Sequence, residues 1–410
     1  MADCEGGKMA ALIPCGQRAL RWVANHESNN LLCDELVGEI LVRLPTTSAV
    51  RFQAVCKRWY SLISSPYFIA RFRHHHNHTD NVESSLVFRF AYSCDFCDSA
   101  DCNQCDSDFQ IISNSSSLLR KVYGESALFR LSYLPCPPTD LHKLRLEGSF
   151  ADLILCSCLI TLTNKIDYYV SNPLTRQWIA LPPAAYESLP QDVSIGFLWV
   201  EDASHHNKFM VVTEKWQWRS LVVSSPLSLN HYGGRTPLVA YRGMLHWLNA
   251  DCIMVYDPLN TPEIFSRVIH LPIPIQISRN NCFGVSQGCL RVAEVSDEYT
   301  IDPILDVWEF EDYDSGLWIL VHKIHLRNLI HNGLLESLQG ELPCFSVLSL
   351  HPENRNVIYL RLLNGVVLVN MKSRIIERFY PINERAVFSW RDAFHLVDQP
   401  WPTAISLLRY

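Results

Sequence analysis

The sequence has no long run of apolar residues. Its longest nearly apolar stretch, Leu153–Leu162, is interrupted by cysteine and serine and is about half as long as a membrane-spanning helix. The first residues, Met1-Ala-Asp-Cys-Glu, lack the basic start and the apolar core of a secretory signal. We therefore expect no membrane partner and an intracellular location, in the cytoplasm, the nucleus or both.

Positive charge is also scarce. The 35 Lys and Arg residues are outnumbered by 42 Asp and Glu, the formal net charge is −7, and there is no long basic stretch. This balance argues against nucleic acid as the main partner. The 15 cysteines are odd in number and have no framework spacing, so we interpret them as the reduced thiols of an intracellular protein.

Signatures of catalysis are few. A glycine-rich phosphate loop, an H-E-x-x-H pair and a dinucleotide fingerprint are all missing from the sequence. Gly284–Gly288 matches the G-x-S-x-G nucleophile elbow, with Ser286 as nucleophile, but the residues after it have strand composition where the elbow needs a helix. A hairpin turn is the favoured interpretation, and a hydrolase using Ser286 is the least favoured alternative. We expect no catalytic residues and no cofactor.

One segment has metal-like spacing. Cys94, Cys97, Cys102 and Cys105 form two C-x-x-C pairs separated by four residues, in a stretch rich in aspartate. Paired thiolates suit tetrahedral zinc, but this spacer is much shorter than in the usual finger or ribbon. We therefore predict no metal, with these four cysteines as a weak zinc candidate in a loop insertion at 94–108.

The 48% of apolar residues and the length of 410 residues predict a globular chain with two or more domains. In Leu31–Phe72, apolar residues recur every four positions at Leu32, Leu36, Ile40 and Leu44, which indicates an amphipathic helix. Pro45 ends this helix. Ser65-Pro66 has the order of a cap followed by a first-turn proline, and predicts the start of a last short helix.

This stretch resembles the F-box, the helical module that docks on the Skp adaptor of cullin-based ubiquitin ligases. The matching positions are Leu32, Leu36, Ile40, Leu41, Leu44, Pro45, Val55, Cys56, Lys57, Trp59 and Leu62. Cys33 departs from the family, which usually has proline after the first leucine. The resemblance implies that the adaptor is contacted by Leu32, Leu36, Ile40, Leu41, Leu44, Pro45, Val50 and Trp59.

After the histidine tract His74–His78, which we interpret as part of a solvated linker, short apolar runs alternate with Asn, Asp, Gly and Pro turns. Turns centred on Asn172, Glu214 and Asp257 are separated by 42 and 43 residues, and later turns near Glu311 and Asn370 follow after gaps of 54 and 59. A period near that of a four-stranded blade predicts a β-propeller. A pair of β-sandwiches is the alternative fold.

The repeats also resemble the F-box-associated region of plant F-box proteins, a kelch-like β-propeller; segments that carry the similarity include Tyr241–Leu248 and Phe345–Pro352. The expected fold is therefore a small all-α F-box of three to four helices followed by an all-β propeller of about six to eight blades. The expected boundaries are a mobile segment at 1–30, the F-box at 31–72, a linker at 73–85, the propeller at 86–398 and a tail at 399–410.

The resemblance implies a non-catalytic substrate receptor of a Skp–cullin–F-box ubiquitin ligase. The F-box would bind the Skp adaptor, and through it a cullin, while the propeller would hold a target protein whose identity the sequence does not reveal. A propeller interaction protein that degrades nothing is the main alternative.

Overall fold

The computed structural model of the chain describes residues 33–76, 84–92, 107–113, 117–123, 131–163, 165–181, 195–201, 207–213, 238–248, 252–257, 260, 265–272, 281–296, 302–313, 315–329, 345–362, 365–382, 386–387 and 393–403. The chain divides into two compact units, Met1–Asp80 and Asn81–Tyr410. The expected mobile segment at 1–30 and the Cys/Asp-rich insertion, apart from the start of one strand, lie outside the described residues.

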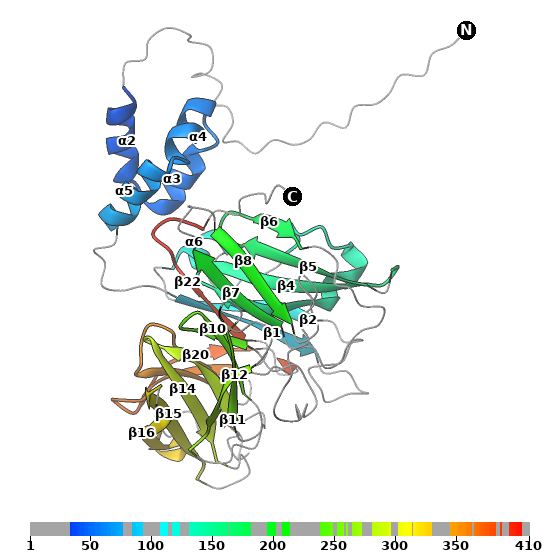
Figure 1. The fold of residues 1–410 in the computed structure, drawn as a ribbon, viewed down its shortest axis with the longest axis vertical. Coiled ribbons are helices and arrows are strands. Elements are labelled where there is room, and N and C mark those ends of the chain that lie inside the picture. The colour runs from blue at the N-terminus through cyan, green and yellow to red at the C-terminus, as the bar shows by residue number, and fades with distance from the viewer. Residues whose placement is uncertain are drawn as a thin grey trace. The chain divides into compact units, whose positions relative to one another are not determined.

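The first unit is a bundle of four short helices, α2 (Asp34–Val42), α3 (Thr46–Phe52), α4 (Lys57–Ile63) and α5 (Pro66–His76) (Figure 1). Pro45 separates α2 from α3, and its carbonyl accepts hydrogen bonds from the amides of Ser48 and Ala49, which starts the new helix. Ser65 caps α5, since its Oγ accepts a hydrogen bond from the amide of Phe68 at 3.2 Å. The helix end predicted at Pro45 and the helix start predicted from Ser65-Pro66 are confirmed.

The core of the bundle is small. It consists of the buried side chains Val37, Leu41, Val42, Ala49, Ile63, Phe68 and Phe72. His76 closes one end, because its ring stacks on Phe72 with 4.1 Å between centroids and its Nε2 lies 2.9 Å from the carbonyl oxygen of Val42. The histidine tract therefore begins as the last turn of α5, so residues 73–76, which were expected in the linker, belong to this helix.

The second unit contains five four-stranded antiparallel sheets and one two-stranded sheet within the described residues. One four-stranded sheet consists of β3 (Leu144–Phe150), β4 (Leu153–Ile160), β5 (Lys165–Asn172) and β6 (Gln177–Ala180). A second consists of β9 (Leu238–Tyr241), β10 (Met244–Leu248), β11 (Cys252–Tyr256) and β12 (Phe265–His270). A third consists of β13 (Asn281–Ser286), β14 (Cys289–Val295), β15 (Ile304–Asp312) and β16 (Leu317–His325). In each, consecutive strands pair as in a blade.

The remaining strands complete the domain. They are β17 (Phe345–Leu350), β18 (Val357–Leu362), β19 (Gly365–Asn370) and β20 (Ile375–Pro381); the pair β7 (Ile195–Glu201) and β8 (Asn207–Thr213); and β1 (Ser84–Tyr92), β2 (Ser107–Ser113), β21 (Ala386–Val387) and β22 (Ala393–Val397). Three short helices, α6 (Leu118–Tyr123), η1 (Pro138–Lys143) and η2 (Leu326–Leu329), lie between strands.

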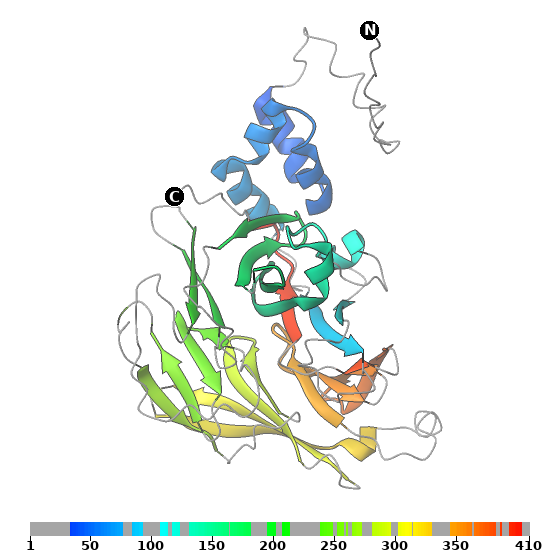
Figure 2. The ribbon, with the colours of Figure 1, turned by 90° about the vertical axis from the view of Figure 1, so that its right-hand side faces the viewer.

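The sheets form a closed ring. The first strands β3, β7, β9, β13 and β17 and the last strand β22 contact one another in turn, and β17 meets β22 to complete the circle. Figure 2 shows the red strand β22 between the sheet of β3–β6 and the orange sheet of β17–β20. Strands from both ends of the unit share one blade, because β21 and β22 pair with β1. The expected β-propeller is confirmed.

Within the described residues the ring has five four-stranded blades, so the expected number of six to eight is wrong. The place between β6 and β9 is occupied by the two-stranded sheet β7–β8. The first strands β9, β13 and β17 of three successive blades begin at Leu238, Asn281 and Phe345, which are 43 and 64 residues apart. The connections between blades are thus longer than a uniform period assumes, so dividing the chain by that period gave too many blades.

The turn positions were predicted well. Asn172, Asp257 and Asn370 each end or follow the third strand of a blade, and each side-chain Oδ1 accepts a hydrogen bond from a backbone amide two or three residues later, at 3.0 Å for Leu174, 3.0 Å for Asn260 and 3.1 Å for Lys372. Such Asx turns explain why Asn and Asp recur there. Glu311 also lies at the end of a third strand, and Glu214 lies outside the described residues.

Residues 399–403 of the segment expected to be a C-terminal tail pack against the propeller. Trp401 is 4% exposed. The amide of Thr403 donates to Asp152 Oδ2 at 2.8 Å, and Asn172 Nδ2 donates to the same Oδ2 at 2.8 Å and to the Thr403 carbonyl at 2.9 Å. Burial raises the pKa of Asp152. These contacts attach Thr403 to the neighbouring blade.

Candidate partner-binding site

Helix α2 has apolar side chains on two faces. Val37, Leu41 and Val42 face the core, whereas Leu36 is 51% exposed and Ile40 is 52% exposed. Leu36 and Ile40 are four residues apart and therefore lie one above the other on the same face of the helix. Two large side chains on other helices of this unit, Tyr60 on α4 and Tyr67 on α5, are also exposed. Exposed apolar side chains on so small a bundle are typical of a surface that binds a partner.

The structure sorts the predicted adaptor contacts by exposure. Leu36, Ile40 and Pro45 are exposed, whereas Leu44, Val50 and Trp59 are half-buried. The Trp59 ring meets Phe52 edge-on at 5.2 Å, so part of it packs within the bundle. Leu32 lies outside the described residues.

The prediction that Leu41 contacts the adaptor needs correction. It is 2% exposed and belongs to the core of the bundle, so it does not reach a partner on the surface. The four-residue period assigns Leu36, Leu41 and Ile40 to one broad apolar stripe, and only the packing of α4 and α5 on one side of it divides the buried residues from the exposed ones.

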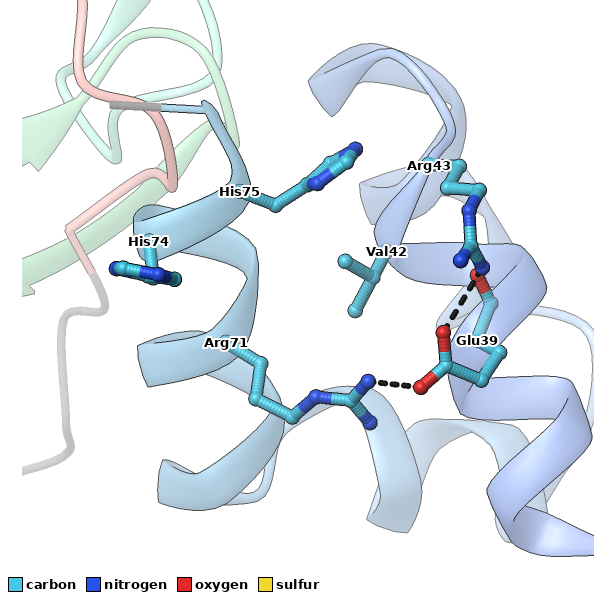
Figure 3. A pocket seen from close by; sticks show the side chains of 6 residues that line it. All are labelled: Glu39, Val42, Arg43, Arg71, His74 and His75. Atoms are coloured by element: carbon cyan, nitrogen blue, oxygen red, sulfur yellow. Dashed lines mark hydrogen bonds and ion pairs between the residues drawn. The ribbon is translucent and has the colours of Figure 1, made fainter. Parts of the chain in front are cut away.

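A polar pocket of about 330 Å³ lies between α2 and α5, lined by Glu39, Val42, Arg43, Arg71, His74 and His75 (Figure 3). Arg71 reaches from α5 to Glu39 on α2 and forms an ion pair with one carboxylate oxygen, and Arg43 Nη1 donates to the other at 2.9 Å. The hydrogen bond from Arg71 holds the pKa of Glu39 below its ordinary value, and the same bond raises the pKa of Arg71.

Sequence reasoning missed this pocket. The i, i+4 spacing of Glu39 and Arg43 predicts their pairing on one helix. Arg71 is 32 residues from Glu39, and no local pattern connects the two. The neighbouring histidines do not form a metal site: in the part of the chain that the structure describes, no group of three or more His, Cys, Asp or Glu could hold a metal ion. The four candidate zinc cysteines lie outside the described residues.

The G-x-S-x-G segment is a hairpin turn, as favoured from the sequence. Gln287 and Gly288 have positive φ values of 47° and 75° and connect β13 directly to β14, the backbone of a two-residue hairpin turn. Ser286 is 1% exposed and its Oγ donates to the carbonyl of His351 at 2.7 Å. A buried hydroxyl that already donates to a backbone carbonyl is no exposed nucleophile, so the geometry gives no support to a hydrolase that uses Ser286.

The propeller has its own concavity. A cavity of about 350 Å³ is lined by residues of β3, β9, β13, β17 and β22, the innermost strands of all five blades, and it therefore lies on the ring axis. Its lining is mostly apolar, and its main polar contact is His395 Nε2 with Ser349 Oγ at 2.8 Å. Burial, with His351 nearby, lowers the pKa of His395 to about 3, so this imidazole is neutral at physiological pH.

All eight cysteines within the described residues are free thiols. No described helix combines the length and the apolar character needed to cross a membrane.

A bundle with an exposed apolar helix face, joined to a β-propeller, defines a two-module binding protein. Comparison with known families matches residues 30–71 to the F-box domain and residues 132–386 to the family described as F-box protein At3g26010-like, beta-propeller. The chain therefore belongs to the plant F-box proteins that carry a β-propeller domain.

Individual relatives agree with this assignment, and all three of the following are from Arabidopsis thaliana. F-box protein At5g49610 is 28% identical over 335 residues, covering 74% of this chain and 81% of the relative. Putative F-box/kelch-repeat protein At1g15680 is 27% identical, covering 76% and 77%. Putative F-box protein At1g47790 is 32% identical over 318 residues, covering 73% of each. These alignments are long enough to include most of the propeller.

Proposed function

We propose that the chain is a substrate-receptor subunit of a Skp–cullin–F-box ubiquitin ligase inside the cell. The helical unit docks on a Skp-family adaptor, and through it joins a cullin, while the propeller holds a target protein for ubiquitination. The observation that carries the proposal is the exposure of Leu36 and Ile40 on a helix whose opposite face is fully buried.

The physical reason for docking is the burial of these two side chains. Covering a Leu or Ile side chain stabilises by about 1.5–3 kcal/mol relative to leaving it in water, and central apolar anchors dominate the affinity of many interfaces. Pro45 is also exposed, and Tyr60 and Tyr67 are exposed in the same unit. Leu44, Val50 and Trp59 remain in the proposed docking set as half-buried contributors, while Leu41 stabilises the bundle from within.

In this role the chain has no catalytic step of its own. A receptor that binds a ligase with one unit and a target with the other raises the effective concentration of the target near the ubiquitin-charged subunits. The chemistry of ubiquitin transfer belongs to those subunits. The division into Met1–Asp80 and Asn81–Tyr410 suits this separation of tasks, because each unit has a core of its own.

The experiment compares the full chain with the Leu36→Ala/Ile40→Ala variant, each expressed in plant cells with the proteasome inhibited, followed by capture and identification of bound proteins and their ubiquitin modification. We expect a set of targets held by both chains but ubiquitinated only with the unsubstituted chain. Equal ubiquitination with both chains would refute the ligase role. Shared partners that carry no ubiquitin with either chain would instead indicate a propeller interaction protein without degradation.

A further inference from the structure

We propose that the pocket between α2 and α5 receives a carboxylate side chain of the docked adaptor. This inference rests on the proposed function, since it concerns the same partner and adds a charged contact to the apolar one. The occupant is an Asp or Glu of the adaptor that lies beside the residues covering Leu36 and Ile40.

The charge of the residues that line the pocket favours an acidic occupant. Two guanidinium groups, those of Arg43 and Arg71, share the single carboxylate of Glu39. The pocket therefore carries more positive than negative charge before either histidine is considered, although the chain as a whole has a net charge of −7. An acidic side chain would balance this local excess, whereas a basic one would add to it.

The hydrogen-bond donors of Arg43 also favour an acidic occupant. Arg43 uses only Nη1, which donates to the backbone carbonyl and to the carboxylate of Glu39. Its Nε and Nη2 donate to no partner within the described residues, and its side chain is 62% exposed. The planar guanidinium fork matches a carboxylate with two parallel hydrogen bonds, so Arg43 has the free donors that such a ligand needs.

The position of Arg43 relative to Leu36 and Ile40 places the pocket within reach of the same partner. Leu36 and Ile40 lie on one face of α2, and Arg43, the C-cap residue of this helix with αR backbone angles, is seven residues beyond Leu36 and continues the same face. Arg43 is three residues beyond Ile40, a rise of about 4.5 Å along the helix axis. A partner segment whose apolar side chains cover Leu36 and Ile40 therefore reaches Arg43 with its next side chains. The cavity of about 330 Å³ is larger than a carboxylate group and accommodates a whole acidic side chain.

The test is a titration of a purified Skp-family adaptor into the full chain at low and high salt, with Arg43→Gln, Arg43→Glu and a matched control, Arg73→Glu. Arg73 is exposed on the same helix as Arg71 but does not line the pocket. We expect Arg43→Gln to weaken binding about tenfold and Arg43→Glu about thirtyfold or more. Arg73→Glu should change the affinity by less than about twofold. The loss should shrink at high salt, because screening weakens an exposed charge pair.

Equal affinities for Arg43→Glu and Arg73→Glu would overturn the inference. Its failure is separable from that of the proposed function. If Leu36→Ala/Ile40→Ala abolishes binding while Arg43→Glu does not weaken it, the docking face stands and the carboxylate contact is wrong. If adaptor binding is absent even in the unsubstituted chain, both are wrong. Asp→Lys and Glu→Lys substitutions across the adaptor should include one that restores binding to Arg43→Glu, which would identify the occupant.

Discussion

Leu36 and Leu41 are leucines on the same helix with opposite environments, and their difference provides a test at the residue scale. Leu41→Ala should destabilise the helical unit by about 2–5 kcal/mol, because it leaves a cavity in a small core. Leu36→Ala should change the free energy of unfolding by less than about 0.5 kcal/mol, because its side chain is half in solvent. Urea unfolding of the full chain followed by helical circular dichroism measures both. Similar destabilisation by the two substitutions would contradict the assigned faces.

Glu294 gives a residue-scale prediction with a defined sign. It lies opposite Asp306 in the β14–β15 ladder, and burial, together with that carboxylate, raises its pKa from 4.5 to about 6. Between these pH values the folded chain binds more protons than the unfolded chain, so stability from this group is present below about pH 4.5 and is lost as the pH rises through 6.

The Glu294→Gln variant should therefore have a higher melting temperature than the unsubstituted chain at pH 7, and the difference should vanish near pH 4. Glu311→Gln, which changes an exposed side chain in the next strand, is the matched control and should leave the melting temperature nearly unchanged. Thermal unfolding at a series of pH values is the measurement. A gain that persists at pH 4, or a loss at pH 7, would contradict the burial argument.

The residues proposed to dock on the Skp adaptor show how far sequence reasoning reaches at this scale. The periodicity of Leu36, Ile40 and Leu44 predicts a helix, but it does not reveal which side of a broad apolar stripe the rest of the bundle covers. Leu41 was therefore included with the surface residues although it is buried. The pairing of Glu39 with Arg71 depends on how α2 packs against α5, and no local pattern contains that information.

At the scale of elements, the sheet β17–β20 contains a position where only glycine fits. A Cβ atom on Gly365 would lie 2.5 Å from the Phe379 ring and 2.7 Å from the carbonyl oxygen of Tyr380. Gly365 pairs with Pro381 in the β19–β20 ladder, so the backbone there has little room to move.

Gly365→Ala should destabilise the propeller by about 1–3 kcal/mol, because an added methyl group must displace backbone in a well-packed sheet. Gly284→Ala in β13 is the control, since its nearest neighbour would be at 3.9 Å, an ordinary contact distance. Differential scanning calorimetry of the two variants checks this prediction. A Gly365→Ala protein as stable as the Gly284→Ala protein would show that the sheet accommodates the methyl group.

Element types were predictable for physical reasons. Proline and serine at helix starts, Asn and Asp at turns, and the change from a four-residue to a two-residue apolar pattern are local signals. The number of blades could not be predicted from the sequence, because the connections between blades vary in length. The partnership of β1 with β22 was also hidden, since it joins strands about 300 residues apart in sequence, and no local period contains it.

For the whole molecule, ring closure is the property that makes the propeller one cooperative unit. Strands β21 and β22 pair with β1 and complete its blade. After β22, Trp401 is buried and the amide of Thr403 donates a hydrogen bond to Asp152 of the neighbouring blade. Without closure, the edges of two blades would be exposed to solvent and to other chains.

We therefore expect removal of residues 383–410 to abolish the cooperative unfolding transition of the propeller and to cause aggregation. Trp401→Ala should lower the stability by about 3–5 kcal/mol while keeping a single transition. Leu162→Ala, at a side chain that is 92% exposed, is the control and should leave stability nearly unchanged. Calorimetry with size-exclusion chromatography makes the measurement. A truncated chain that is monomeric and unfolds like the full chain would contradict the role of closure.

The most direct test of the account is the affinity of the whole chain for a purified Skp-family adaptor, measured by isothermal titration calorimetry. The account predicts 1:1 binding that weakens at least about tenfold for Leu36→Ala and for Ile40→Ala singly, and that disappears in the double variant while the propeller's unfolding transition is unchanged. Undiminished adaptor binding by a folded double variant, or the absence of binding by the unsubstituted chain, would contradict it.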